Sequence, residues 1–160
     1  MVTSPQPDSA TPIEITTDIS RIDLDRVHDW LARKSYWAGE MPRAVFDRAV
    51  AGSLCFGAIE RGATVGFARV VSDRATFAYL SDVFVDPARR GRGISKAMMA
   101  AVVAHPALQN LRLWLLATAD AHGLYAQYGF TPPAVPQRYM ERRDPDVYLR
   151  MAKAAGPPAP

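Results

Sequence analysis

The sequence predicts a single α/β domain in which a mixed, mostly antiparallel sheet is flanked by helices. Three observations support this: a helix-period apolar pattern near the N-terminus, three strand-like runs in the middle, and an apolar helix followed by a buried strand. The chain has 160 residues, of which 49% are hydrophobic. It is therefore long enough for one core and too short for two comfortable domains.

The expected domain covers residues 13–150. Residues 1–12 are rich in Pro, Ser and Thr, and the chain ends in Gly-Pro-Pro-Ala-Pro. Such segments bury too little apolar surface to offset the entropy of ordering. We therefore expect a disordered N-terminal segment at 1–12 and a flexible C-terminal tail at 151–160.

A first strand and two helices are expected in the N-terminal part. Residues 13–17 form the strand, and Asp18 or Ser20 can cap the helix that follows. That helix carries apolar residues on one face at helical spacing: Leu24, Val27 and Leu31. Pro42 suits the first position of the second helix, which runs to about residue 51.

The middle of the chain reads as an antiparallel meander of three strands. Turn-like residues at 61–62 and 72–74 separate the strand-like runs. The runs cover residues 53–60, 64–71 and 76–85.

The last part alternates helices and strands. We expect an apolar helix, a buried strand, a short helix and a final extended strand, at residues 95–104, 111–117, 121–128 and from Phe130 onward. The complete expected order is β-α-α-β-β-β-α-β-α-β.

Composition excludes several classes of function. The formal net charge of +3 is spread along the chain and is too mild to indicate nucleic-acid binding. Cys55 is the only cysteine, and the three histidines are scattered, so neither a disulfide nor a metal site is expected. The longest apolar run, 97–104, is too short to cross a bilayer, and the N-terminus lacks a signal pattern. We expect a cytoplasmic protein that binds neither nucleic acid nor membranes.

The loop between the third strand of the meander and the next helix is the clearest functional signal. Gly91 and Gly93 can bring bare backbone close to a ligand, and three arginines surround them. The helix that begins here directs unpaired N–H groups and its positive dipole end at the same place. The loop is therefore a predicted anion site.

Residues 90–95, Arg-Gly-Arg-Gly-Ile-Ser, resemble the Arg-x-x-Gly-x-Gly/Ala signature of the GNAT superfamily of N-acetyltransferases. In that family the loop binds the pyrophosphate of acetyl-coenzyme A (acetyl-CoA), and the strand before it pairs with the pantetheine arm. Ser95 departs from the family pattern at the final position. The resemblance implies cofactor contacts at Phe84, Val85, Arg89, Arg90, Gly91, Arg92, Gly93, Ile94, Ser95 and Lys96.

A second segment resembles the same family. Residues 125–130, Tyr-Ala-Gln-Tyr-Gly-Phe, are similar to its Phe-Tyr-Glu-Lys-x-Gly-Phe motif. The resemblance gives Tyr125 the position beside the thioester sulfur, where the family tyrosine often serves as general acid. Thr118 stands where the family often has an asparagine that holds the cofactor arm.

Asp82 is the candidate general base. Strict alternation places it on one face with Ala78, Leu80 and Phe84, and a carboxylate among apolar neighbours can remove a proton from an amine. The alternative is an ion pair or a backbone hydrogen bond at a strand irregularity. Arg69 is expected on the same face but several residues away, as a substrate-carboxylate contact or a solvated edge residue rather than the direct partner of Asp82.

The resemblance implies an N-acyltransferase that transfers an acetyl group from acetyl-CoA to a primary amine by direct attack in a ternary complex. Tyr36 and Trp37 lie in the inter-helix loop that borders the acceptor site in this family. The acceptor is a small-molecule amine or a protein amine. The sequence does not decide between a monomer and a homodimer. The alternative function is a non-catalytic acyl-CoA-binding sensor or partner domain.

Overall fold

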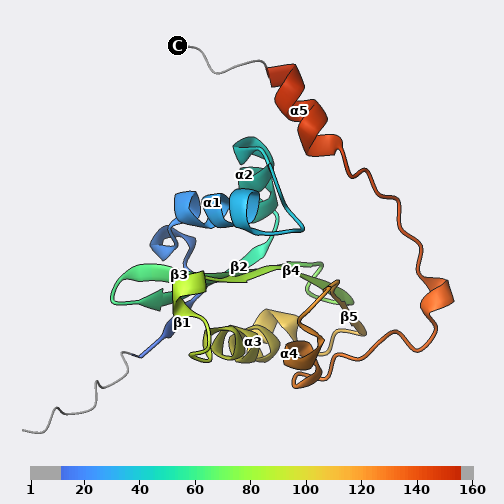
Figure 1. The fold of residues 1–160 in the computed structure, drawn as a ribbon. Helices are drawn as coiled ribbons and strands as arrows, with labels where there is room; N and C mark the ends of the chain where they lie inside the picture. Colours follow the sequence, from blue (N-terminus) through green and yellow to red (C-terminus); the bar gives the residue numbers. More distant parts are fainter. Residues whose placement is uncertain (1–11, 156–160) are drawn as a thin grey trace, which may run out of the picture.

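The computed structural model describes residues 12–155, and it contains one five-stranded sheet (Figure 1). The sheet order follows the chain: β1 (Glu14–Thr16), β2 (Leu54–Glu60), β3 (Ala63–Ser72), β4 (Phe77–Val85) and β5 (Leu113–Leu115). Neighbouring strands are antiparallel except β4 and β5, which are parallel. The predicted fold class, a mixed and mostly antiparallel sheet flanked by helices, is confirmed.

Within residues 12–155, four helices cover the two faces of the sheet, and a fifth, near the C-terminus, lies away from it (Figure 1). The helices are α1 (Leu24–Lys34), α2 (Arg43–Ala51), α3 (Ile94–Ala104), α4 (His122–Ala126) and α5 (Val147–Ala155). Figure 1 shows α1 and α2 on one face and α3 and α4 on the other. No helix in residues 12–155 is long and apolar enough to span a membrane.

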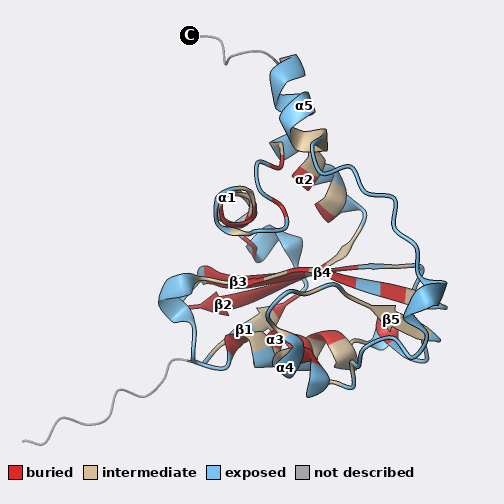
Figure 2. Ribbon diagram, turned by 45° about the vertical axis from the view of Figure 1, so that its right-hand side comes forward, coloured by how far each residue is buried: buried red, intermediate tan, exposed pale blue. Residues whose placement is uncertain are grey.

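Two apolar cores follow from this layering (Figure 2). The α3-side core packs α3 and α4 onto the sheet and includes Phe56, Val70, Leu80, Met98 and Val102. The α1-side core packs α1 and α2 onto the opposite face and includes Val27, Leu31, Phe46, Phe67 and Phe84. Because β2, β3 and β4 are covered on both faces, their buried residues alternate between the two cores.

The N-terminal cap of α1 differs from the prediction. Asp18 instead caps a short 3₁₀ turn at Ile19–Arg21, where its carboxylate accepts from the backbone N–H of Ser20. Ile22 is extended, so α1 starts afresh after it, and Asp23 accepts from the backbone N–H of Arg26 at 3.0 Å. Neither Asp18 nor Ser20 is therefore the cap of α1.

The strand predicted from Phe130 onward does not form within residues 12–155. Residues 131–146 are irregular and exposed, apart from a 3₁₀ turn at Pro136–Arg138, and they lead into α5. Pro132, Pro133 and Pro136 lack the N–H groups that a sheet ladder requires. Helix α5 continues past residue 150, the predicted end of the domain. The predicted segment 1–12 lies almost wholly outside the described residues.

Strand β4 contains a β-bulge that the sequence pattern did not reveal. Arg69 pairs with Ser81 and Phe67 pairs with Phe84, so β4 uses one more residue than β3 between these pairs. Asp82 sits at this irregularity with a left-handed φ of 53°. The extra residue changes which side chains face which core. The prediction that Asp82 shares a face with Ala78 and Leu80 is therefore wrong.

Candidate active site

A cleft of about 650 Å³ opens where β4 and β5 separate. The two strands pair over only three residues, from Phe77↔Leu113 to Tyr79↔Leu115. Beyond Tyr79, the second half of β4 forms one wall, and residues 116–121, after β5, form the other. The loop before α3, the first turn of α3, helix α4, and the loop between α1 and α2 complete the lining.

The loop between β4 and α3, residues 86–93, is called the glycine loop and contributes main-chain N–H donors to this cleft. Gly91 and Gly93 both have φ of 76°, and an added Cβ at either would meet no atom within 4 Å. The backbone conformation, rather than crowding, is therefore what favours glycine here. Gly93 is the N-cap of α3 and has no side-chain cap; the first helical bond runs from Ala97 N–H to the Gly93 carbonyl at 2.9 Å. The N–H groups of the first turn are left for an anionic ligand.

Positive side chains flank the glycines, but they are not equivalent. Arg90 and Lys96 line the cleft, and Arg90 lies over the ring of Phe84 and donates to the Val85 carbonyl at 3.3 Å. Arg89 also lines the cleft. Among the arginines predicted to contact the cofactor, Arg92 is outside the lining.

The side chain of Arg92 binds a buried carboxylate instead of lining the cleft. Arg92 donates to both oxygens of Glu60, at 2.5 and 3.2 Å, and Arg89 lies 3.0 Å from the same carboxylate. The Glu60 side chain is only 4% exposed. Hydrogen bonds from Arg92 hold the pKa of Glu60 below its ordinary value. Sequence reasoning missed Glu60, because a glutamate at the end of a strand gives no local signal of a distant arginine.

Tyr125 projects from the short helix α4 into the cleft and is 9% exposed. Its ring meets Phe130 edge-on, with centroids 6.1 Å apart. Burial raises the pKa of Tyr125 to about 12, and the nearby Tyr36 and Asp120 act in the same direction. The phenol therefore keeps its proton at neutral pH and can donate it.

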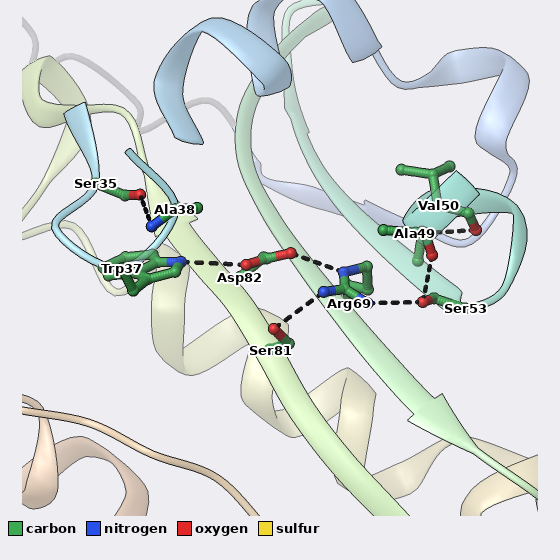
Figure 3. A network of polar contacts seen from close by, with 10 residues as sticks. Ser35, Trp37, Ala38, Ala49, Val50, Ser53, Arg69, Ser81 and Asp82 are labelled. Carbon is green, nitrogen blue, oxygen red and sulfur yellow. Dashed lines mark hydrogen bonds and ion pairs between the residues drawn. The ribbon is translucent and has the colours of Figure 1, made fainter. Parts of the chain in front are cut away.

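Asp82 is the centre of a polar network (Figure 3). Its Oδ2 accepts from Arg69 Nε at 2.7 Å, and its Oδ1 accepts from Trp37 Nε1 at 3.1 Å. The guanidinium of Arg69 also donates to the hydroxyls of Ser53 and Ser81, at 3.1 and 3.2 Å. The prediction that Arg69 is not the direct partner of Asp82 is wrong, because the bulge brings Asp82 beside Arg69. Arg69 is mostly buried and does not line the cleft.

The loop between α1 and α2 brings two aromatic side chains to the cleft. Tyr36 and Trp37 both line it, and their rings are nearly perpendicular at 4.8 Å between centroids. The Tyr36 hydroxyl accepts a hydrogen bond from the backbone N–H of Ala119, on the other wall, at 3.0 Å. Both rings stay partly exposed, at 62% and 43%.

The structure thus brings all the predicted site residues to one cleft except Arg69 and Arg92. Thr118 lines it, and its hydroxyl accepts from the backbone N–H of Ala121 at 3.0 Å. The prediction omitted the exposed carboxylate of Asp120, whose only signal was its place in the loop after a buried strand. Within the described part of the chain, no group of His, Cys, Asp and Glu side chains could hold a metal ion.

Comparison with known proteins agrees with this geometry. A family model described as "Acetyltransferase (GNAT) domain" matches residues 51–132, which run from the end of α2 past the glycine loop and α4. The chain belongs to the GNAT family. It is therefore an acetyltransferase-type enzyme. A Gibberella zeae protein named as an acetyltransferase is 28% identical to this GNAT protein in an alignment of length 148 that covers 79% of this chain and 82% of that one.

Solved structures share this GNAT fold. A protein of Xanthomonas campestris pv. campestris assigned to the GNAT family is 55% identical, with a TM-score of 0.84 over 87% of this chain and 99% of that one. The aminoglycoside N-acetyltransferase AAC(6')-Iy, whose structure is a complex with CoA, is 19% identical. It gives a TM-score of 0.58 over 89% of this chain and 99% of that one, a likeness of fold alone.

Proposed function

We propose that this enzyme transfers an acetyl group from acetyl-CoA to a primary amine by direct attack in a ternary complex. One observation carries the proposal: the glycine loop, the unpaired half of β4 and Tyr125 all line the same cleft. An anion site, an open strand edge and a proton donor are what a phosphate-bearing thioester and a departing thiolate require.

The residues present fit the cofactor. The N–H groups at the start of α3 suit a pyrophosphate, and Arg90 and Lys96 supply positive charge beside them. The part of β4 beyond Tyr79 has no β5 partner, so its main chain at 83–85 can pair with an extended arm. When bound, acetyl-CoA supplies a thioester carbonyl that an amine can attack. The CoA complex of AAC(6')-Iy, which shares the fold, supports this assignment.

Tyr125 is the proposed general acid. Its hydroxyl carries a proton at neutral pH, because burial disfavours the phenolate. Giving that proton to the departing thiolate reduces the charge on its sulfur as the C–S bond breaks, and the acceptor amine releases its protons to water as the C–N bond forms. The packing of its ring against Phe130 holds the hydroxyl in place.

The acceptor is proposed to be a small-molecule or protein amine that enters beside Tyr36 and Trp37. Their exposed rings offer apolar and cation–π surface to an amine that arrives protonated. Asp120 adds a carboxylate to the same cleft.

Calorimetric titration of acetyl-CoA tests the cofactor. Wild type is compared with Gly93→Glu, which places a carboxylate in the glycine loop, and with Gly62→Glu as the matched control. Gly62 has a similar φ of 78° and open space around it, but it does not line the cleft. We expect binding to wild type and Gly62→Glu and its loss in Gly93→Glu.

A thiol-release assay with a panel of amines then tests turnover. Release that depends on an added amine supports the transferase. Binding of acetyl-CoA to wild type without thiol release from any amine favours the acyl-CoA-binding sensor instead. No binding to wild type would remove the basis of both.

A further inference from the structure

We infer that Asp82 is a positioning residue that fixes Trp37 over the cleft, and that it does not remove a proton from the acceptor. The segment concerned is the strap, residues 35–41 between α1 and α2. The inference rests on the proposed function for its kinetic consequences, whereas its structural part, the contact between Asp82 and Trp37, can be tested without any substrate.

The base of the strap is fixed by its own hydrogen bonds. The Ser35 hydroxyl donates to the Leu31 carbonyl at 2.7 Å and accepts from the Ala38 N–H at 3.1 Å. The N–H of Glu40 donates to the Ala32 carbonyl at 2.8 Å, and the side chains of Ala38 and Met41 are buried in the α1-side core. The backbone that carries the two aromatic side chains is therefore ordered by packing.

The tip of the strap reaches both walls of the cleft. Trp37 donates to Asp82 on β4, and Tyr36 accepts from Ala119 on the segment after β5. These are the walls that the sheet leaves unpaired beyond Tyr79. The strap thus joins two strand ends by side chains where backbone pairing stops.

The geometry of Asp82 suits a residue that holds Trp37 in place better than it suits a general base. One carboxylate oxygen accepts from Trp37 and the other from Arg69 (Figure 3), and the side chain is 4% exposed. Each oxygen keeps a second lone pair, but both oxygens are already bonded within a side chain that is 4% exposed, so an amine has little room to approach either of them. A general base needs an oxygen within hydrogen-bond reach of the substrate.

Arg69 holds the Asp82 carboxylate in its orientation. Its three donor nitrogens bind Asp82, Ser53 and Ser81, so the guanidinium is fixed between β2, β3 and β4. The bulge matters as well, because the left-handed backbone at Asp82 turns the carboxylate toward the α1 side, where Trp37 lies. A charged acceptor makes a stronger hydrogen bond to the indole than a neutral one would.

A spectroscopic test measures the contact between Asp82 and the Trp37 indole directly. In a proton–nitrogen correlation spectrum of the full chain, the three tryptophans give three indole N–H signals, and Trp37→Phe identifies the one from Trp37. Asp82→Gly removes the carboxylate and suits the left-handed backbone. We expect the Trp37 signal to move and to exchange faster with solvent in Asp82→Gly. An unchanged Trp37 signal would overturn the inference whatever the activity.

Kinetics separate the two roles. With a positioning role, Trp37→Phe and Asp82→Gly each raise KM for the amine roughly threefold to tenfold, the worth of one hydrogen bond, whereas Asp82→Asn, whose amide oxygen can still accept from the indole, has a smaller effect. The KM of the double variant Trp37→Phe/Asp82→Gly is then no higher than that of the single variant with the higher KM, because the two side chains act through one contact. The pH–rate profile keeps its shape. With a base role, Asp82→Asn lowers kcat by about 100-fold or more, removes the acidic limb of the profile, and Trp37→Phe has little effect. That second pattern would overturn the inference.

Asp47→Asn is the matched control. It removes an exposed carboxylate of α2 that Arg43 contacts at 2.7 Å, away from the cleft. We expect it to change neither the Trp37 signal nor the kinetics. A change as large as that of Asp82→Gly would show that the effects are unspecific and would count against the inference.

Discussion

Replacing Arg69 with glutamine removes the charged partner of the Asp82 carboxylate, which is 4% exposed and keeps the Trp37 indole as a donor. Breaking a buried ion pair by removing one partner costs about 3 to 5 kcal/mol of unfolding free energy. Because Arg69 itself is 14% exposed and Trp37 stays, we expect about 3 kcal/mol for Arg69→Gln. Asp82→Asn leaves a guanidinium that keeps Ser53 and Ser81 as acceptors, and we expect about 2 kcal/mol.

The double variant Arg69→Gln/Asp82→Asn places two neutral amides in contact, and we expect it to cost only about 1 kcal/mol. The charge that each single variant leaves unpaired is then gone. Asparagine also tolerates the left-handed backbone at position 82.

Urea unfolding at neutral pH, followed by circular dichroism, measures these differences. With a slope of about 2 kcal/mol per molar urea for a domain of this size, Arg69→Gln should lower the midpoint by about 1.5 M and the double variant by about 0.5 M. A loss in the double variant equal to the sum of the two single losses would refute the reasoning, because it would show that the two side chains do not interact.

Three further predictions concern other parts of the molecule. Tyr125→Phe should lower kcat on the order of 100-fold while calorimetry finds acetyl-CoA binding unchanged, because only the hydroxyl is removed; an equal loss of binding would contradict the general-acid role. Hydrogen bonds from Thr76, Ala75 and Phe77 hold the pKa of Asp73 well below its ordinary value. The stability that they give is present above the unfolded pKa of about 3.9 and is lost as pH falls below it, so thermal melts of Asp73→Asn should depend less on pH between about 5 and 2. Asp82→Gly should be more stable than Asp82→Ala by about 1 kcal/mol in urea, because alanine is strained at a φ of 53°.

The order of elements as far as α4 could be predicted because local signals determine it. Helical spacing in α1, the turn residues between β2, β3 and β4, and the glycines before α3 each act within a few neighbours. The resemblance of two segments to one family then indicated which of these elements border the site. The cleft itself follows from that order, since β4 and β5 are neighbours in the sheet and the cleft opens between the second half of β4 and the segment after β5.

The faces of β4 could not be predicted, because alternation counts residues and a bulge adds one. Nothing near Asp82 indicates a left-handed backbone, so its pairing with Arg69 and Trp37 also stayed hidden. Contacts between distant segments were also missed, because no local signal identifies a partner far along the chain. Arg92 was predicted as a cofactor contact, whereas Glu60, 32 residues earlier, binds it.

Glu60 has a consequence for how the glycine loop attracts a polyanion. With Arg92 and Arg89 held by a buried carboxylate, much of their charge is already compensated within the protein. The attraction then falls on Arg90, Lys96 and the backbone N–H groups, and the N–H groups act over a few ångströms, inside the range that dissolved ions screen. Adding salt should therefore weaken the affinity of this loop less than the number of its arginines suggests.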